Sequence, residues 1–131
     1  MNTAGQTAKP KRIFVAEDEY LVFLALEDDL KDLGFDVLGP FVTLAAARAA
    51  AASEAVDLAL LDINMSGEMA YPLADDFAAK GVPFIFLSGY TADAYPERYR
   101  GAARICKPYD PSMLIAQVQR MIEGRKADSL P

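Results

Sequence analysis

The sequence predicts an α/β fold in which a parallel β-sheet carries helices on both faces. Two observations support this prediction: strand-like segments alternate with helical segments along the chain, and the strand-like segments are apolar at nearly every position. Alternation of strands and helices is typical of parallel sheets. A strand with one face in water would alternate apolar and polar residues, so apolar runs indicate a sheet that is covered on both sides.

Five segments have the length and the apolar content of short buried strands: residues 12–16, 35–38, 57–61, 83–87 and 103–106. Gly39-Pro40 is expected to close the second strand, and residues 65–70 to form a glycine-containing loop after the third. Residues 90–100 give no clear pattern, because Pro96 interrupts a stretch that otherwise favours a short helix.

Four helical segments separate and follow these strands. Apolar residues at helical spacing mark three of them: Phe23, Leu26, Leu30 and Leu33; Leu73, Ala74 and Phe77; and Leu114, Ile115, Val118, Met121 and Ile122. Gly34 and Gly81 are expected to end the first and third helices. Thr43 is the expected N-cap of an alanine-rich second helix, and Asp110 followed by Pro111 is a typical start for the last.

Five such units in 131 residues predict a flavodoxin-like, doubly wound, five-stranded parallel sheet with strand order 2-1-3-4-5 and helices on both faces. Residues 11–124 are expected to form this single domain, between a flexible lead at 1–10 and a flexible tail at 125–131. In this fold, ligands bind outside the carboxyl ends of the strands, here between the first and third.

Composition excludes several classes of function. The chain has no histidine, which excludes histidine metal sites and histidine-based catalytic triads. Its net charge is −6 without a basic stripe, which argues against nucleic-acid binding, and no apolar run is long enough to span a membrane. The polar N-terminus is unlike a signal peptide, and the single cysteine, Cys106, fits a reducing compartment, so we expect a cytoplasmic protein. Cys106, Phe84 and Phe86 are expected to pack in the core.

Polar residues follow four of the predicted strands. Glu17-Asp18 follows the first, Asp62 the third, Ser88 the fourth and Lys107 the fifth. Parallel strands joined by right-handed crossovers end at one edge of the sheet, so these side chains are expected to meet there. Three carboxylates need counter-charge; Lys107 supplies one, and Mg²⁺, a hard cation that prefers oxygen ligands, is the expected other.

These residues closely resemble the receiver domain of two-component response regulators, over residues 12–123. The resemblance implies that Asp62 accepts a phosphoryl group from a histidine kinase or a histidine phosphotransfer protein. It implies a Mg²⁺ site made by Asp62, Asp18 as direct ligand, Glu17 through water and the backbone carbonyl of Asn64. Ser88 and Lys107 would contact the phosphoryl oxygens, and the Lys107-Pro108 peptide would be cis. Such a domain catalyses only its own phosphorylation and dephosphorylation and is otherwise no enzyme.

The sequence also departs from that family. Many receivers carry an aromatic residue three positions before the lysine, where this chain has Arg104; Tyr90 and Tyr109 are candidates to replace it. Phe86-Leu87-Ser88-Gly89-Tyr90 partly resembles a Phe-Ala-Thr-Gly segment of some stand-alone receivers. With eight residues after 123, a free-standing receiver is expected, which acts on a downstream protein by contact or drains phosphoryl groups from a shared kinase.

Three alternatives are weighed against this interpretation. An aspartate-nucleophile Mg²⁺ phosphohydrolase commonly needs a second aspartate two residues on, where this chain has Asn64. A flavin or dinucleotide binder needs a glycine-rich loop after the first strand, and residues 16–21 contain no glycine. A receiver-like interaction module that works without phosphorylation is disfavoured because every site position carries a competent residue.

Overall fold

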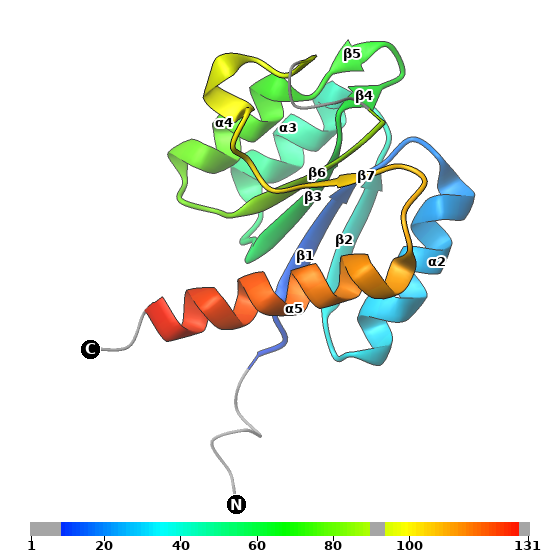
Figure 1. Cartoon of the computed structure of the whole chain (residues 1–131), viewed down its shortest axis with the longest axis vertical. Coiled ribbons are helices and arrows are strands. Elements are labelled where there is room, and N and C mark those ends of the chain that lie inside the picture. The colour runs from blue at the N-terminus through cyan, green and yellow to red at the C-terminus, as the bar shows by residue number, and fades with distance from the viewer. Residues whose placement is uncertain (1–8, 90–93, 129–131) are drawn as a thin grey trace, which may run out of the picture.

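The structure, a computed structural model, describes residues 9–89 and 94–128. These residues form a five-stranded sheet, a small hairpin, four α-helices and a 3₁₀ turn (Figure 1). In chain order the elements are β1 (Arg12–Ala16), α2 (Tyr20–Asp32), β2 (Asp36–Phe41), α3 (Leu44–Ser53), β3 (Leu58–Asp62), β4 (Asn64–Met65), β5 (Glu68–Met69), α4 (Tyr71–Ala79), β6 (Phe84–Ser88), η2 (Glu97–Tyr99), β7 (Arg104–Cys106) and α5 (Pro111–Asp128). None of the described helices combines the length and the apolar character that crossing a membrane requires.

The main sheet is parallel, with strand order β2-β1-β3-β6-β7. Numbered among themselves, these five strands have the order 2-1-3-4-5, so the predicted flavodoxin-like fold is confirmed. The register pairs Ala16 of β1 with Leu61 of β3, and Asp62 of β3 with Leu87 of β6. The carboxyl ends of the three central strands therefore lie level at one edge of the sheet.

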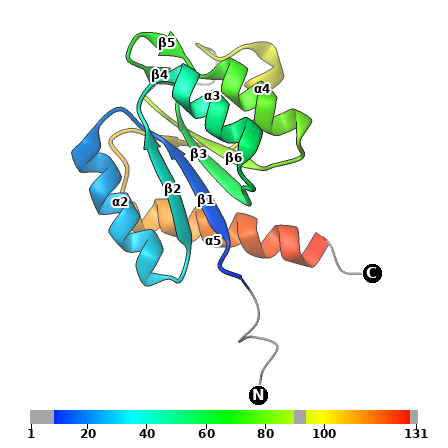
Figure 2. The same cartoon turned by 180° about the vertical axis from the view of Figure 1, so that it is seen from behind.

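Each face of the sheet is covered by two helices: α2 and α5 lie on one face, and α3 and α4 on the other (Figures 1 and 2). All five residues of β3 are buried, as its two-sided apolar pattern predicts. Alternate strand residues enter the two layers. Leu60 packs with Phe23 of α2 and Leu114 of α5, whereas Leu61 packs with Phe77 of α4.

Two predicted details near the second strand are wrong. β2 does not stop at Leu38 but continues through a cis Gly39-Pro40 peptide to Phe41. A side chain at Gly39 would lie 2.5 Å from the backbone oxygen of Val15, so glycine here permits close strand packing rather than ending the strand. Leu33 is 43% exposed, because α2 ends at Asp32 and Leu33 has left the helical stripe.

Three further segments differ from their predicted form. Residues 64–69 form the antiparallel hairpin β4–β5, rather than an irregular loop. Helix α5 continues to Asp128, past the predicted domain end at 124. Cys106 is exposed rather than internal, because β7 is an edge strand and Cys106 points away from the layer that holds Ile105. Phe86 is buried and Phe84 partly buried, so both belong to the core as predicted.

Candidate functional site

Three carboxylates and one ammonium group meet at the carboxyl ends of β1, β3 and β7. Carboxylate oxygens of Glu17, Asp18 and Asp62 all lie within 4.8 Å of one another. The Lys107 Nζ atom donates a hydrogen bond to Asp62 Oδ2 at 3.1 Å and lies 3.4 Å from Glu17 Oε2. Strand register brings these residues together, since Glu17, Asp62 and Lys107 come from the ends of three different strands.

Ser88 reaches the same edge of the sheet as the last residue of β6. It stands one position beyond Leu87, the register partner of Asp62, and is 3% exposed. Its backbone oxygen accepts a hydrogen bond from the Lys107 backbone nitrogen at 2.8 Å, which ties the two strand ends together. The Lys107-Pro108 peptide is cis, as the resemblance implies.

Asn64, two residues after Asp62, lies at the surface at the start of the β4–β5 hairpin. Its backbone nitrogen donates to Asp62 Oδ1 at 3.3 Å, and its side-chain oxygen accepts from the Gly67 backbone nitrogen at 2.9 Å. The second carboxylate that an aspartate-based phosphohydrolase commonly uses is therefore replaced by an amide that closes a turn.

The carboxylates of the site outnumber its one ammonium group, and their pKa values reflect this excess together with their burial. Burial, followed by the charge of Asp62, raises the pKa of Glu17 from 4.5 to about 7. Burial likewise raises the pKa of Asp62, although Lys107 opposes the shift. Burial lowers the pKa of Lys107, but the carboxylates of Asp62 and Glu17 outweigh it, so the net shift of that pKa is upward. One ammonium group thus faces a cluster of carboxylates that it cannot neutralise.

This donor set fits a hard divalent cation. Glu17 is completely buried, and its Oε2 atom accepts no hydrogen bond in the described part of the chain, although Lys107 Nζ lies 3.4 Å away. A buried charged oxygen without a hydrogen bond is costly unless a cation compensates it. Asp18 is half-buried and Asp62 is 6% exposed, so the cluster opens toward solvent on the Asp18 side. Oxygen-only ligands of this kind are those that Mg²⁺ prefers.

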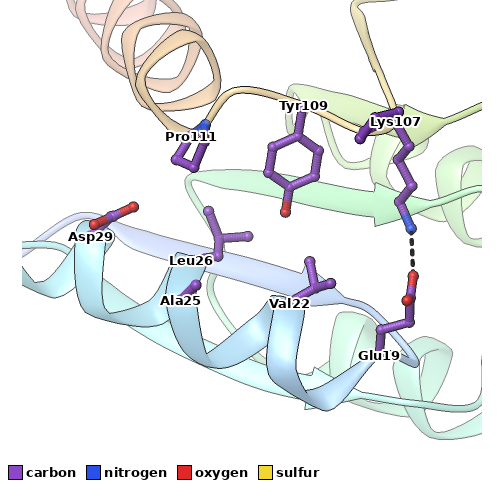
Figure 3. Close-up of a pocket in the computed structure, with 9 residues that line it drawn as sticks. Glu19, Val22, Ala25, Leu26, Asp29, Lys107, Tyr109 and Pro111 are labelled. Carbon is purple, nitrogen blue, oxygen red and sulfur yellow. Dashed lines mark ion pairs between the residues drawn. The ribbon is translucent and has the colours of Figure 1, made fainter.

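An apolar groove of about 470 Å³ adjoins the cluster between α2 and the segment that joins β7 to α5 (Figure 3). Leu26 and Tyr109 line it, and an ion pair of 3.5 Å between Lys107 Nζ and Glu19 Oε1 bounds it beside the carboxylates. Asp62 is not among the lining residues. Burial, followed by the charge of Glu17, raises the pKa of the Tyr109 hydroxyl.

Arg104 stands at the position where many receivers carry an aromatic residue, and its guanidinium group packs against the ring of Tyr95. The Arg104 guanidinium carbon lies 5.4 Å from the centroid of the Tyr95 ring. Tyr95 is 2% exposed, and its hydroxyl has no hydrogen-bond partner in the described residues. Of the two tyrosines that were candidates to replace the aromatic residue, Tyr109 lies in the groove and Tyr90 lies outside the described residues. The contact between Arg104 and Tyr95 is not among the sequence-based predictions.

Comparisons with known proteins identify the family. No family model matches the chain. It is similar to SdrG from Sphingomonas melonis Fr1, with 31% identity over 88% of this chain and 98% of that chain and a TM-score of 0.74. It is also similar to a CheY-like response regulator receiver domain protein from Methanospirillum hungatei JF-1, with a TM-score of 0.78 over 92% of this chain and 99% of that one. The chain belongs to the response regulator receiver domains.

The other matches agree with this assignment, but they differ in sequence identity and in the share of each chain that is covered. Identity to the receiver from Methanospirillum hungatei is 23%, so that likeness shows the fold alone. The BeF₃-activated conformation of SdrG from Pseudomonas melonis Fr1 is 30% identical over 85% of this chain and 95% of that chain, with a TM-score of 0.70. The transcriptional regulatory protein PdtaR of Mycobacterium tuberculosis is 28% identical over 121 residues. This receiver domain spans 59% of that curated relative's length.

Sequence reasoning named Glu17, Asp18, Asp62, Ser88 and Lys107, and the structure brings all five to one edge of the sheet. It overlooked two contributors: the Glu19 carboxylate beside Lys107, and the backbone nitrogen of Ser66, which donates to Asp18 Oδ2 at 3.0 Å. Glu19 stands directly after the acidic pair, and a Ser-Gly pair in a short loop is a turn signal, so both had a signal in the sequence.

Proposed function

We propose that this receiver domain is a phosphorylation-dependent signalling switch of a two-component system and that Asp62 is the residue that accepts the phosphoryl group. The observation that carries this proposal is the position of Asp62 between an acidic pair, of which Glu17 is buried and Asp18 half-buried, and an ammonium group that bonds one of its oxygens. An aspartate with this neighbourhood combines a nucleophilic oxygen with charge compensation for an incoming phosphoryl group.

Each neighbouring residue has a separate role in the proposal. Glu17, Asp18, Asp62 and the backbone carbonyl of Asn64 would hold Mg²⁺, which when bound offsets negative charge on the phosphoryl oxygens. Lys107 Nζ bonds the Asp62 carboxylate at 3.1 Å and favours its ionised form, which a nucleophile requires. The Ser88 hydroxyl, fixed at the end of β6, would donate a hydrogen bond to a phosphoryl oxygen and so report that Asp62 is modified.

The phosphoryl donor is a histidine kinase or a histidine phosphotransfer protein in this proposal, and the output is contact with a downstream protein or depletion of the shared phosphoryl pool. The BeF₃-activated conformation of a 30% identical relative supports an activation step of this kind. The domain transfers phosphoryl groups only to and from itself, and it works in the cytoplasm. The amide at Asn64, engaged in a turn, disfavours a phosphohydrolase.

The test is labelling with acetyl phosphate, followed by intact-mass spectrometry. The proposal expects one phosphoryl group per chain in Mg²⁺, none in excess chelator, and none for Asp62→Asn in either condition. Asp57→Asn is the matched control, because Asp57 is another aspartate near β3 whose carboxylate accepts from the Arg12 backbone nitrogen at the opposite end of the sheet. Unchanged labelling of Asp62→Asn would show that the acceptor is misassigned.

A further inference from the structure

The β4–β5 hairpin contacts the acidic cluster from a distant part of the chain. The backbone nitrogen of Ser66, at the hairpin tip, donates a hydrogen bond of 3.0 Å to Asp18 Oδ2, across 48 positions of sequence. Asp18 itself follows β1, whereas the hairpin follows β3. A backbone group of one loop therefore sets the orientation of a carboxylate on another.

The local sequence fixes that backbone nitrogen in place. Ser66 and Gly67 have φ angles of +53° and +92°, the values of a two-residue type I′ hairpin turn. The Asn64 side-chain oxygen accepts from the Gly67 backbone nitrogen at 2.9 Å and closes the turn. Met65, completely buried, anchors the hairpin in the core. The Ser66 backbone nitrogen is thus presented by a turn that is held at its base while its tip is exposed.

Asp18 needs a group that holds its orientation because it is the most exposed carboxylate of the three. Glu17 and Asp62 are buried, whereas Asp18 is half-buried on the open side of the cluster. Two like charges about 4 Å apart near a protein surface repel by about 4 kcal/mol, and the direction that relieves this repulsion is outward into solvent. A hydrogen bond from a backbone nitrogen to a carboxylate is charge-assisted and opposes that movement.

We propose that the β4–β5 hairpin is a positioning element for the metal site. The Ser66 backbone nitrogen holds Asp18 in its metal-binding orientation, so that Mg²⁺ affinity and formation of the Ser66–Asp18 hydrogen bond are coupled. This deepens the proposed function and rests on its assignment of Asp18 as a metal ligand. Hydrogen bonds that orient metal ligands typically contribute 10- to 100-fold to metal affinity. Coupling is reciprocal, so bound Mg²⁺ must favour the hairpin conformation that makes this hydrogen bond by the same factor.

Two substitutions at one position separate this role from general stability. Ser66→Pro removes the donor nitrogen's hydrogen and cannot adopt a φ of +53°. Ser66→Gly keeps the N–H and adopts a positive φ without strain. In calorimetric Mg²⁺ titrations of the purified protein, Ser66→Pro is expected to bind about 10-fold more weakly or worse, and Ser66→Gly within about 2-fold of wild type. Equal affinity of wild type and a folded Ser66→Pro overturns the coupling.

Hydrogen exchange in the wild type keeps the proposal testable even if Ser66→Pro does not fold. Saturating Mg²⁺ is expected to slow exchange of the Ser66 amide about 10-fold. The Ala46 amide is the control, because it also donates to a side-chain oxygen, that of Thr43 at 3.2 Å, but lies at the start of α3. Unchanged Ser66 exchange while Mg²⁺ binds refutes the positioning role alone. Wild-type protein that binds no Mg²⁺ refutes the metal role in the proposed function as well.

Discussion

Replacing Glu17 by glutamine is expected to stabilise the Mg²⁺-free protein at high pH, although it removes a site residue. The pKa of Glu17 is raised from 4.5 to about 7, first by burial and then by Asp62. The folded protein therefore holds this proton more tightly than the unfolded chain. Protonated Glu17 therefore adds to the free energy of unfolding. This contribution is complete below pH 4.5 and is lost as the pH rises through about 7.

The size of the effect follows from the same shift. At about 1.4 kcal/mol for each pH unit, ionised Glu17 costs the folded state about 3 kcal/mol above pH 8. Glutamine mimics the protonated form and does not ionise, so Glu17→Gln is expected to gain up to this amount at pH 8 and little at pH 5. For a domain of this size that corresponds to a rise in Tm of about 10 °C.

The assay is thermal unfolding followed by circular dichroism, in chelator, at pH 5 and pH 8. Glu19→Gln is the matched control: it neutralises an exposed carboxylate that also pairs with Lys107, and is expected to change stability by less than about 1 kcal/mol. Adding Mg²⁺ at pH 8 is expected to stabilise wild type more than Glu17→Gln, which lacks one of the carboxylates of the proposed metal site. Parallel stability curves for wild type and Glu17→Gln between pH 5 and pH 8 would show that the pKa of the buried Glu17 carboxyl is not raised in the folded protein.

Three other substitutions test separate contacts by urea unfolding. Lys107→Met leaves the Asp62 carboxylate without its ammonium partner and is expected to destabilise the Mg²⁺-free protein by about 1–3 kcal/mol at pH 8; no loss would mean that the pair is screened by water. Tyr95→Phe removes a buried hydroxyl for which residues 9–89 and 94–128 supply no hydrogen-bond partner, and it is expected to raise stability by about 1 kcal/mol; a decrease would reveal a bond to that hydroxyl. Thr43→Ala deletes the N-cap bond to the Ala46 nitrogen and is expected to cost about 1 kcal/mol, and Thr43→Ser should restore most of it.

The sheet and its site were predictable because their signals are local and agree with each other. In the predicted strand at 57–61, residues 58–61 are apolar on both sides, which is decisive for a central parallel strand, and β3 occupies nearly the same residues. Once the strand order is known, Glu17, Asp62 and Lys107 must end at one edge, so the cluster follows from topology. The capping residue Thr43 was readable from its type and position alone.

What escaped prediction depends on contacts between distant residues. Nothing near Gly39 shows that its backbone must approach Val15, so Gly39-Pro40 reads as the end of a strand that in fact continues. The burial of Tyr95 depends on packing against Phe86 and on the guanidinium of Arg104, which no periodicity encodes. Edge position decides the exposure of Cys106, since a strand with one neighbour leaves part of its surface uncovered.

The measurement that tests the central claim most directly is chemical identification of the phosphorylated residue. Borohydride reduces an aspartyl phosphate to homoserine, and tandem mass spectrometry of the labelled, reduced protein locates that change in the sequence. We predict homoserine at position 62 and at no other aspartate, and only after labelling in Mg²⁺. Homoserine at another position, or a phosphoryl group that withstands borohydride on a serine, threonine or tyrosine, would contradict the assignment of Asp62 as the acceptor.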